Sequence, residues 1–129
     1  MLEVYDMPAS LAFYRDLLGF EIIGSAPPKA RDDRFGWVWL THGETAIMLN
    51  AAYESDDVRP PLPEEQRVAA HRDTALFIGA PDVDAVYEHL RGHGIDVKPP
   101  NVTHYGMRQL CVTDPDGFGL CFQWEAKGT

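Results

Sequence analysis

The chain has 129 residues, the length of one ordinary domain, and can therefore bury a proper hydrophobic core. Its formal net charge of −9 argues against nucleic acid or an anionic membrane surface as a partner. No apolar run reaches the roughly 18 residues of a membrane-spanning helix, and no export signal precedes the first periodic segment. We therefore expect a cytoplasmic protein in which Cys111 and Cys121 are reduced thiols.

The first part of the chain predicts one helix among four strands. The stub "LEVY" has the composition of a short strand. Asp6 is placed to cap a helix, because apolar residues recur at helical spacing from Met7 to Leu18. Gly19 can end that helix. Three segments of strand length and apolar content follow: "FEIIG", "RFGWVWLTHG" and "ETAIMLN".

Residues 51–72 interrupt the pattern with three prolines and mixed charge, so we expect a linker with a short helix near residues 64–70. The strand "TALFI" then begins a second series. Pro81 is expected to open a helix that Gly92 and Gly94 stop. Three further strands are expected over "IDVKPP", "RQLCVTDPDG" and "FGLCFQW".

The order β-α-β-β-β therefore occurs twice, in residues 1–50 and 73–129, which indicates two copies of one module within a single domain. Strands such as "GWVWL" and "GLCFQW" are apolar at nearly every position, a pattern typical of strands covered on both faces. The two helices are too few to cover both faces of two sheets. Curved sheets that enclose a cavity, in a homodimer, would satisfy this pattern.

The stretch "DMPASLAFYRDLLGF" near the start and "DPDGF" near the end, in two such modules, resemble the vicinal oxygen chelate superfamily. This superfamily includes glyoxalase I, extradiol dioxygenases, fosfomycin-resistance enzymes and bleomycin-resistance proteins. The resemblance implies an α+β fold in which two βαβββ modules form curved mixed sheets around a cleft. It does not fix the function, because the superfamily hosts many chemistries.

Metal-dependent members of this superfamily bind their ion with residues from four strands. By this resemblance, the first ligand would fall before Met1, and the others fall on Met48, Asp73 and Cys121. A methionine thioether is a poor ligand for hard cations and is better suited to filling apolar gaps. We therefore expect no metal and no cofactor.

A different metal site could form if other side chains converged. The candidates are His71, Asp73, His104, Cys111 and Cys121. The alternative is that the cysteines are small buried hydrophobic residues and the histidines lie at loop ends. We favour this alternative, because none of these candidates has the CxxC or HxxxH spacing of a metal-binding pair.

Two short patterns resemble the bleomycin-resistance proteins, small acidic dimers that sequester a cationic, flat-ringed antibiotic. By this resemblance, "DDRFGWVWLTHGETAIML" and "HYGMRQLCVTDPDG" place Phe35 and Tyr105 at stacking positions. Each is also compatible with an ordinary hydrophobic residue that covers the core. Arg108 either binds an anion or pairs with Asp114 or Asp116 across the hairpin, and we favour the pairing.

Alternation along the strands predicts the cleft lining, because residues i and i+2 share a face and the former ligand positions mark the inward one. Trp37 and Trp39 share one face of their strand, although alternation does not decide which one. The predicted ligand-binding residues are Phe35, Trp37, Trp39, Met48, Asn50, Asp73, Phe77, Tyr105, Arg108, Cys121 and Gln123. Glu3 either joins them or is a solvated carboxylate. Such an aromatic and apolar lining with few polar groups is typical of a small-molecule site.

Three functions fit these features. The one we favour is a metal-free homodimeric binding protein that sequesters an aromatic or cationic small molecule in an acidic, aromatic-lined cleft. The alternative is an enzyme, a lyase, isomerase or dioxygenase with a non-standard metal set, or a cofactor-free enzyme that uses Asp73 as a general base. The third is a regulatory or assembly domain with a vestigial pocket. Neither nucleic acid nor a membrane is expected as a partner.

Overall fold

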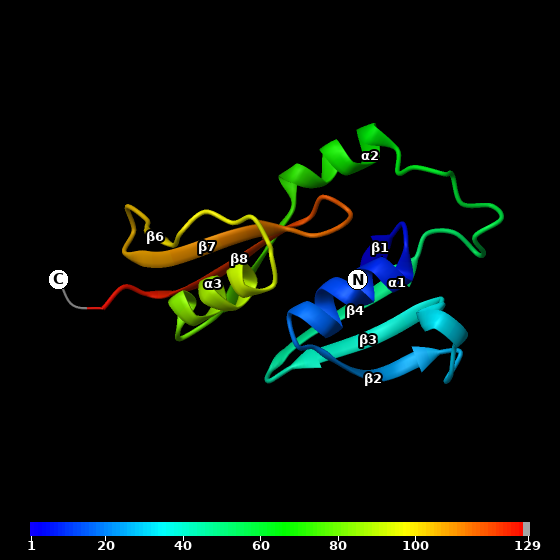
Figure 1. Ribbon diagram of the computed structural model, residues 1–129, viewed down its shortest axis with the longest axis horizontal. Helices are drawn as coiled ribbons and strands as arrows, with labels where there is room; N and C mark the ends of the chain where they lie inside the picture. The colour runs from blue at the N-terminus through cyan, green and yellow to red at the C-terminus, as the bar shows by residue number, and fades with distance from the viewer. Residues whose placement is uncertain (128–129) are drawn as a thin grey trace. The chain divides into compact units, whose positions relative to one another are not determined.

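The computed structural model of the chain describes residues 1–127. The chain divides into two compact units, with the boundary between Val68 and Ala69. Each unit contains a helix and a four-stranded mixed sheet, so the predicted β-α-β-β-β order is present twice (Figure 1). Within residues 1–127, no helix is both long enough and apolar enough to cross a membrane.

The sheet of the first unit has the strand order β1-β4-β3-β2. Strand β1 pairs with β4 in parallel, whereas β4, β3 and β2 pair in antiparallel fashion. The elements of this unit are β1 (Leu2–Val4), α1 (Met7–Leu11), a π-helical segment (Ala12–Leu17), β2 (Glu21–Ala26), β3 (Trp37–His42) and β4 (Thr45–Ala51).

The first helix begins and ends where the sequence predicts. The side chain of Asp6 accepts a hydrogen bond from the backbone N–H of Ala9 at 3.4 Å, which caps the helix N-terminus. The helical backbone continues as far as Leu18, and Gly19 follows it with φ +85°, the left-handed conformation that glycine adopts most easily. The predicted helix Met7–Leu18 is therefore present, although its second half is a π-helix.

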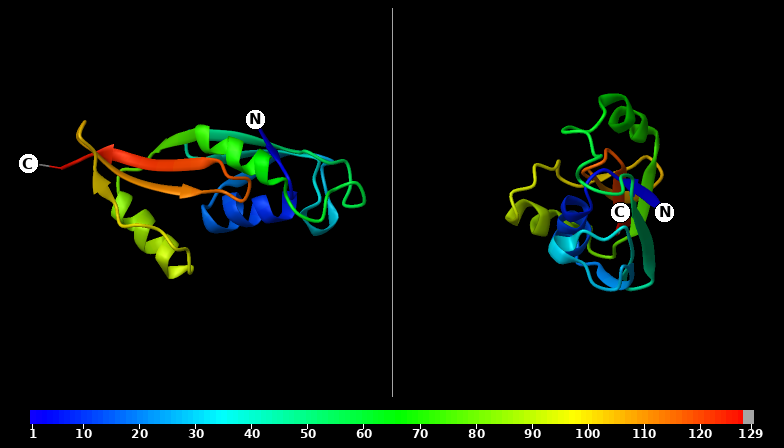
Figure 2. Two further views of the ribbon diagram at one scale, coloured as in Figure 1. Left: turned by 90° about the horizontal axis from the view of Figure 1, so that it is seen from above. Right: turned by 90° about the vertical axis from the view of Figure 1, so that its right-hand side faces the viewer.

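This helix covers one face of the sheet of the first unit (Figure 2). Val38, Leu40 and Leu49 on that face are fully buried, as are Leu11 and Tyr14 on the helical segment. The opposite face of the same strands is open, and two large side chains on it, those of Trp39 and Met48, are 42% and 38% exposed. The first unit by itself therefore buries only one of the two apolar faces that the sequence pattern indicates.

The second unit repeats this arrangement, with the strand order β5-β8-β7-β6. Leu110, Leu120 and Phe122 are buried on the sheet face that α3 crosses, together with Val83 and Leu90 of α3 itself (Figure 2). Its elements are β5 (Ala75–Gly79), α3 (Val83–Gly92), β6 (Asn101–Val102), β7 (Met107–Thr113) and β8 (Gly119–Glu125), and α2 (Glu65–Ala70) spans the boundary between the units.

Two local predictions for this unit are wrong. The segment "IDVKPP" forms no strand, and β6 contains only the next two residues, Asn101 and Val102. Pro99 and Pro100 lack the N–H groups that a strand needs for pairing. Helix α3 starts at Val83 and not at Pro81, because Asp82 is its N-cap and accepts a hydrogen bond from the N–H of Ala85 at 3.0 Å.

The prediction of reduced thiols is also wrong, because Cys111 and Cys121 form a disulfide. The two residues are register partners on the antiparallel strands β7 and β8, with a Cα–Cα distance of 4.1 Å. Directly opposite positions bring two side chains of the same sheet face together. The expectation of reduced thiols rested on the cellular compartment alone, whereas the register of the hairpin brings the two sulfur atoms together.

Candidate functional site

The first unit contains a pocket of about 700 Å³ where β1 and β4 end and β3 begins. Four aromatic side chains and three carboxylates contribute to its wall. The residues that line it include Tyr5, Phe35, Trp37, Asn50 and Tyr53, together with Arg34, Glu54, Asp56, Asp57 and Arg59. Three of the predicted ligand-binding residues, Phe35, Trp37 and Asn50, therefore lie around a single cavity.

The aromatic wall of this pocket is held by contacts among its own residues. The rings of Tyr5 and Tyr53 meet edge to face, with centroids 6.1 Å apart. The guanidinium of Arg59 lies over the Tyr5 ring, 5.0 Å from its centroid, and the Tyr5 hydroxyl donates a hydrogen bond to the carbonyl of Pro60. Tyr5 and Tyr53 were not among the predicted site residues. Tyr5 stands two residues after Glu3 in the predicted strand "LEVY", so alternation from Glu3 could have found it, whereas Tyr53 lies in the predicted linker.

The residues that line this pocket carry a net negative charge. It has three carboxylates, those of Glu54, Asp56 and Asp57, and two guanidinium groups, those of Arg34 and Arg59, which gives one net negative charge. Both guanidinium groups pair with Asp56, Arg34 directly and Arg59 at 3.8 Å. A cationic ligand would therefore meet carboxylates that the arginines only partly neutralise.

The segment that carries Phe35 is tied to the first helix by Arg15. Its guanidinium donates two hydrogen bonds to the carboxylate of Asp33, at 2.9 Å and 2.8 Å. These hydrogen bonds hold the pKa of Asp33 below its usual range and raise that of Arg15. Asp32 and Asp33 both have left-handed backbone, with φ of 55° and 59°. Asp33 therefore has a structural role, because its ion pair holds the segment before Phe35 against the first helix.

Replacing Asp33 with asparagine is expected to destabilise the protein at pH 7 by about 0.5–1 kcal/mol. The value is small because the ion pair between Arg15 and Asp33 is partly exposed and screened by solvent. Since the folded pKa of Asp33 is depressed, its contribution is present above the unfolded pKa of about 3.9 and is lost as the pH falls through the folded pKa. The difference between the two proteins in urea denaturation should therefore shrink towards pH 2.

Asp32→Asn is the matched control for this prediction. Asparagine also tolerates the left-handed conformation, and the Asp32 side chain is 73% exposed, with only a 3.9 Å contact to Arg31. We expect its effect to be nearly independent of pH. A pH dependence that is equal in the two variants would contradict the assigned role of Asp33.

The open face of the first sheet continues from the pocket. Trp37 is the register partner of Asn50, and Trp39 is the partner of Met48. Gly24 lies against both tryptophan rings, 3.6 Å from each at the point where a Cβ atom would stand. A Cβ atom at this position would be in ordinary van der Waals contact with both rings, so Gly24 packs closely beside the aromatic surface of this face.

The polar end of this face is formed by an amide and a carboxylate. Asn50 donates hydrogen bonds to the two carboxylate oxygens of Glu3 at 3.1 Å and 3.2 Å. Glu3 is also the register partner of Asn50 on the parallel strand β1. Of the two alternatives for Glu3, the structure therefore favours a position on the open face beside Asn50.

The open face of the second unit brings four other predicted residues together. Phe77 is the register partner of Cys121, and its side chain is 58% exposed. Gln109 donates hydrogen bonds to the side-chain oxygen of Gln123 at 3.0 Å and to the Tyr105 hydroxyl at 3.2 Å. Gln109 was not predicted, although its place opposite Gln123 follows from the hairpin register.

Two predicted residues lie elsewhere in the second unit. Arg108 forms a two-pronged ion pair with Asp84 of α3, at 2.9 Å and 2.6 Å, so the expected pairing with Asp114 or Asp116 is wrong. These hydrogen bonds lower the pKa of Asp84 and raise that of Arg108. Asp73 is exposed in a short 3-10 turn, His71–Asp73, ahead of β5.

Asp114 does not pair with Arg108, because its carboxylate is hydrogen-bonded within the turn before β8. Its carboxylate is buried and accepts hydrogen bonds from the N–H groups of Asp116 and Phe118, both at 2.9 Å. His71 stacks on the Phe118 ring, with centroids 3.9 Å apart, and its Nδ1 lies 2.6 Å from the Asp116 carbonyl. The "DPDGF" motif therefore has a structural role here.

The donor set of the superfamily's metal site does not fit an ion in this chain. The sulfur of Cys121 is bonded to that of Cys111, so it offers no thiolate. Met48 contributes a thioether to an exposed sheet face. Across residues 1–127, no three His, Cys, Asp or Glu side chains are grouped closely enough to hold a metal ion.

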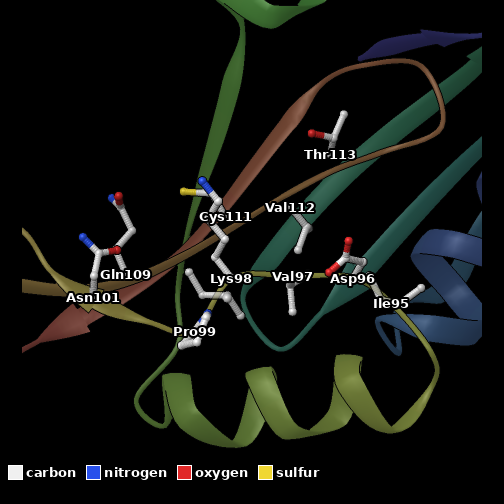
Figure 3. Close-up of a pocket in the computed structure, with 11 residues that line it drawn as sticks. Ile95, Asp96, Val97, Lys98, Pro99, Asn101, Gln109, Cys111, Val112 and Thr113 are labelled. Atoms are coloured by element: carbon white, nitrogen blue, oxygen red, sulfur yellow. The ribbon is translucent and has the colours of Figure 1, made fainter.

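A second cavity, of about 420 Å³, lies entirely in the second unit. It lies between β7 and the segment "IDVKPP", which was expected to be a strand, so its lining includes Val97, Lys98 and Pro99 as well as Cys111, Val112 and Thr113 (Figure 3). The sequence did not predict this cavity, because a paired strand would have filled it.

The fold and the sequence place the chain in a known group. Residues 1–122 match the glyoxalase/bleomycin resistance protein/dioxygenase superfamily. The chain belongs to this superfamily. The resemblance found in the sequence and the α+β fold of two βαβββ modules are thereby confirmed.

Comparison with one related sequence and two solved structures shows how far the likeness to known proteins extends. The uncharacterized protein YaeR of Escherichia coli (strain K12) is 31% identical over 118 residues, covering 89% of this chain and 84% of YaeR. TioX from Micromonospora sp. ML1 has 18% identity and a TM-score of 0.71, covering 96% of this chain and 94% of TioX. A bleomycin-binding protein complexed with bleomycin has 20% identity and a TM-score of 0.65, covering 96% and 93% of the two chains. The last two likenesses show a shared fold.

Proposed function

We propose that this chain binds a small molecule that carries a planar, cationic group, in the pocket of the first unit. The observation that supports this most directly is the lining itself, in which four aromatic side chains stand beside three carboxylates. The fold is shared with a bleomycin-binding protein, which is compatible with such a role. The open face with Trp39 and Met48 would extend the contact surface beyond the pocket.

The physical basis is stacking combined with charge. An aromatic ring packed against a planar ligand contributes about 0.5–1.5 kcal/mol beyond the apolar area that it buries. A cation held near aromatic faces gains a further contribution, which grows as water is excluded. Phe35 and Trp37 are half-buried, so each retains surface for a ligand.

Metal-dependent catalysis is not part of this proposal. At the positions that correspond to the superfamily's ligands, this chain has a thioether in Met48, a disulfide sulfur in Cys121 and an exposed carboxylate in Asp73. Asp73 also lies in a short turn ahead of β5 and does not line the pocket, so it is not placed to act as a general base on a ligand there. Binding without chemistry therefore fits these residues best.

Bleomycin and a panel of other planar aromatic cations are the probes for this proposal, with tryptophan fluorescence and calorimetry as readouts. At least one cation should bind, and Phe35→Ala should weaken that binding about 3- to 10-fold, as expected from the loss of one stacking partner. Matched neutral aromatic compounds should bind more weakly, because the carboxylates of the lining would no longer contribute.

Val58→Ala provides the matched control. Val58 is 61% exposed and stands in sequence between Asp57 and Arg59, but it does not line the pocket. Its replacement should leave the affinity unchanged. The proposal fails if no cation in the panel binds, or if Phe35→Ala and Val58→Ala bind a cation equally well.

A further inference from the structure

The C-terminal end of α3 presents two histidines on one side. His89 and His93 are four residues apart, so they lie one helical turn from each other. Their ring centroids are 4.4 Å apart, with an angle of 44° between the ring planes, and both side chains are exposed. Neither residue belongs to the pocket or to the open faces described above.

The tautomer of His93 follows from its hydrogen bond. Its Nδ1 atom lies 2.8 Å from the backbone carbonyl oxygen of His89. A carbonyl oxygen can only accept, so Nδ1 carries the hydrogen and the lone pair of the neutral ring lies on Nε2. A backbone carbonyl in this role also fixes the orientation of a metal-binding imidazole and raises its basicity.

The electrostatic surroundings favour a cation at this place. The last carbonyl groups of a helix give its C-terminus a partial negative charge. Arg91 is the nearest cationic residue in sequence, and its guanidinium lies over the Tyr87 ring, 5.6 Å from the centroid. Residues 87 and 91 share a side of the helix that points away from the side of residues 89 and 93.

We propose that His89 and His93 together chelate one divalent transition-metal ion, through one imidazole nitrogen from each residue. Imidazole suits Cu²⁺, Ni²⁺ and Zn²⁺, and the general order of stability places Cu²⁺ first. Mg²⁺ and Ca²⁺ prefer oxygen ligands and should not compete. No third His, Cys, Asp or Glu joins the pair within residues 1–127, so the remaining coordination positions are left to water or to a small ligand.

Calorimetric titration of the full, oxidised chain with CuCl₂ at pH 7.5 tests this proposal, with Ni²⁺ and Zn²⁺ as weaker competitors and Mg²⁺ as the negative probe. We expect one Cu²⁺ per chain. His89→Gln and His93→Gln should each weaken binding about 10- to 100-fold, since a single imidazole loses the advantage of intramolecular chelation. The electron paramagnetic resonance spectrum should show coupling to two nitrogens in the wild type and fewer in each variant.

The controls separate this site from general binding to histidine. His104→Gln removes an exposed histidine from a different loop and should leave Cu²⁺ affinity unchanged. The proposal is overturned if the His89→Gln/His93→Gln double variant, with an unchanged circular dichroism spectrum, binds Cu²⁺ as tightly as the wild type. It is equally overturned if His104→Gln weakens binding as much as His93→Gln.

Discussion

Replacing Leu40 with alanine is expected to lower the free energy of unfolding by about 2–5 kcal/mol. Leu40 is fully buried on the face of β3 that packs under the first helical segment, and its neighbour on β4 is Ile47. Alanine would leave a cavity among Leu40's closely packed neighbours, and this cavity adds to the lost transfer free energy. Urea denaturation followed by circular dichroism measures the difference.

Trp39→Ala is the matched comparison, because Trp39 is adjacent in sequence and lies on the opposite face. Its side chain is 42% exposed, so we expect a loss of only about 1 kcal/mol although tryptophan is the larger residue. A loss as large as that of Leu40→Ala would mean that the open face is buried in the native protein. The pair of variants therefore reports which sheet face forms the core of the first unit.

The same alternation explains why much of the fold could be predicted from the sequence. Helical spacing from Met7 onwards and strand-length apolar runs gave the repeated β-α-β-β-β order, which the structure confirms. These signals are local, since they depend on side chains one turn or two residues apart. The register of β3 and β4 pairs Trp37 with Asn50 and Trp39 with Met48, so alternation places these four side chains on one face of the sheet.

The pocket of the first unit could be predicted only in part. Phe35 was found through a family resemblance and Asn50 through strand alternation from Met48. Alternation showed that Trp37 shares a face with Trp39 but not which face this is. Tyr5 and Tyr53 enter the wall because the end of β1 and the segment after β4 run close together, as their ring contact shows. Periodicity in a sequence shows only local relationships, so it does not show that two segments distant in the chain lie side by side.

Arg108 illustrates the same limit for charges. The sequence offered Asp114 and Asp116 as partners because they are near in the hairpin. The structure instead uses Asp84, which is 24 residues away and belongs to α3. Asp114 is already engaged by the N–H groups of its own turn. A carboxylate in a tight turn is often committed to the backbone, and this should have counted against it as an ion-pair partner.

Reduction of the disulfide between Cys111 and Cys121 is expected to lower the free energy of unfolding by about 2–3 kcal/mol. The bond closes a short loop, with a sequence separation of 10 residues, and the loss of that constraint on the unfolded chain sets the magnitude. Urea denaturation of the wild type with and without dithiothreitol measures the effect. The number of free thiols should rise from none to two per chain, as counted with a thiol reagent in denaturant.

The Cys111→Ala/Cys121→Ala variant makes this expectation specific. It should unfold at the same urea concentration with and without reductant, because no other cysteine is present in the sequence. If reductant leaves the unfolding midpoint of the wild type unchanged as well, or if the wild type has two free thiols before reduction, the native pair is a dithiol. Phe77 and Gln109 lie on the same sheet face as this bond, so its removal would loosen the support beneath them as well as the hairpin itself. The state of the bond should therefore be determined before any binding measurement on residues of the second unit.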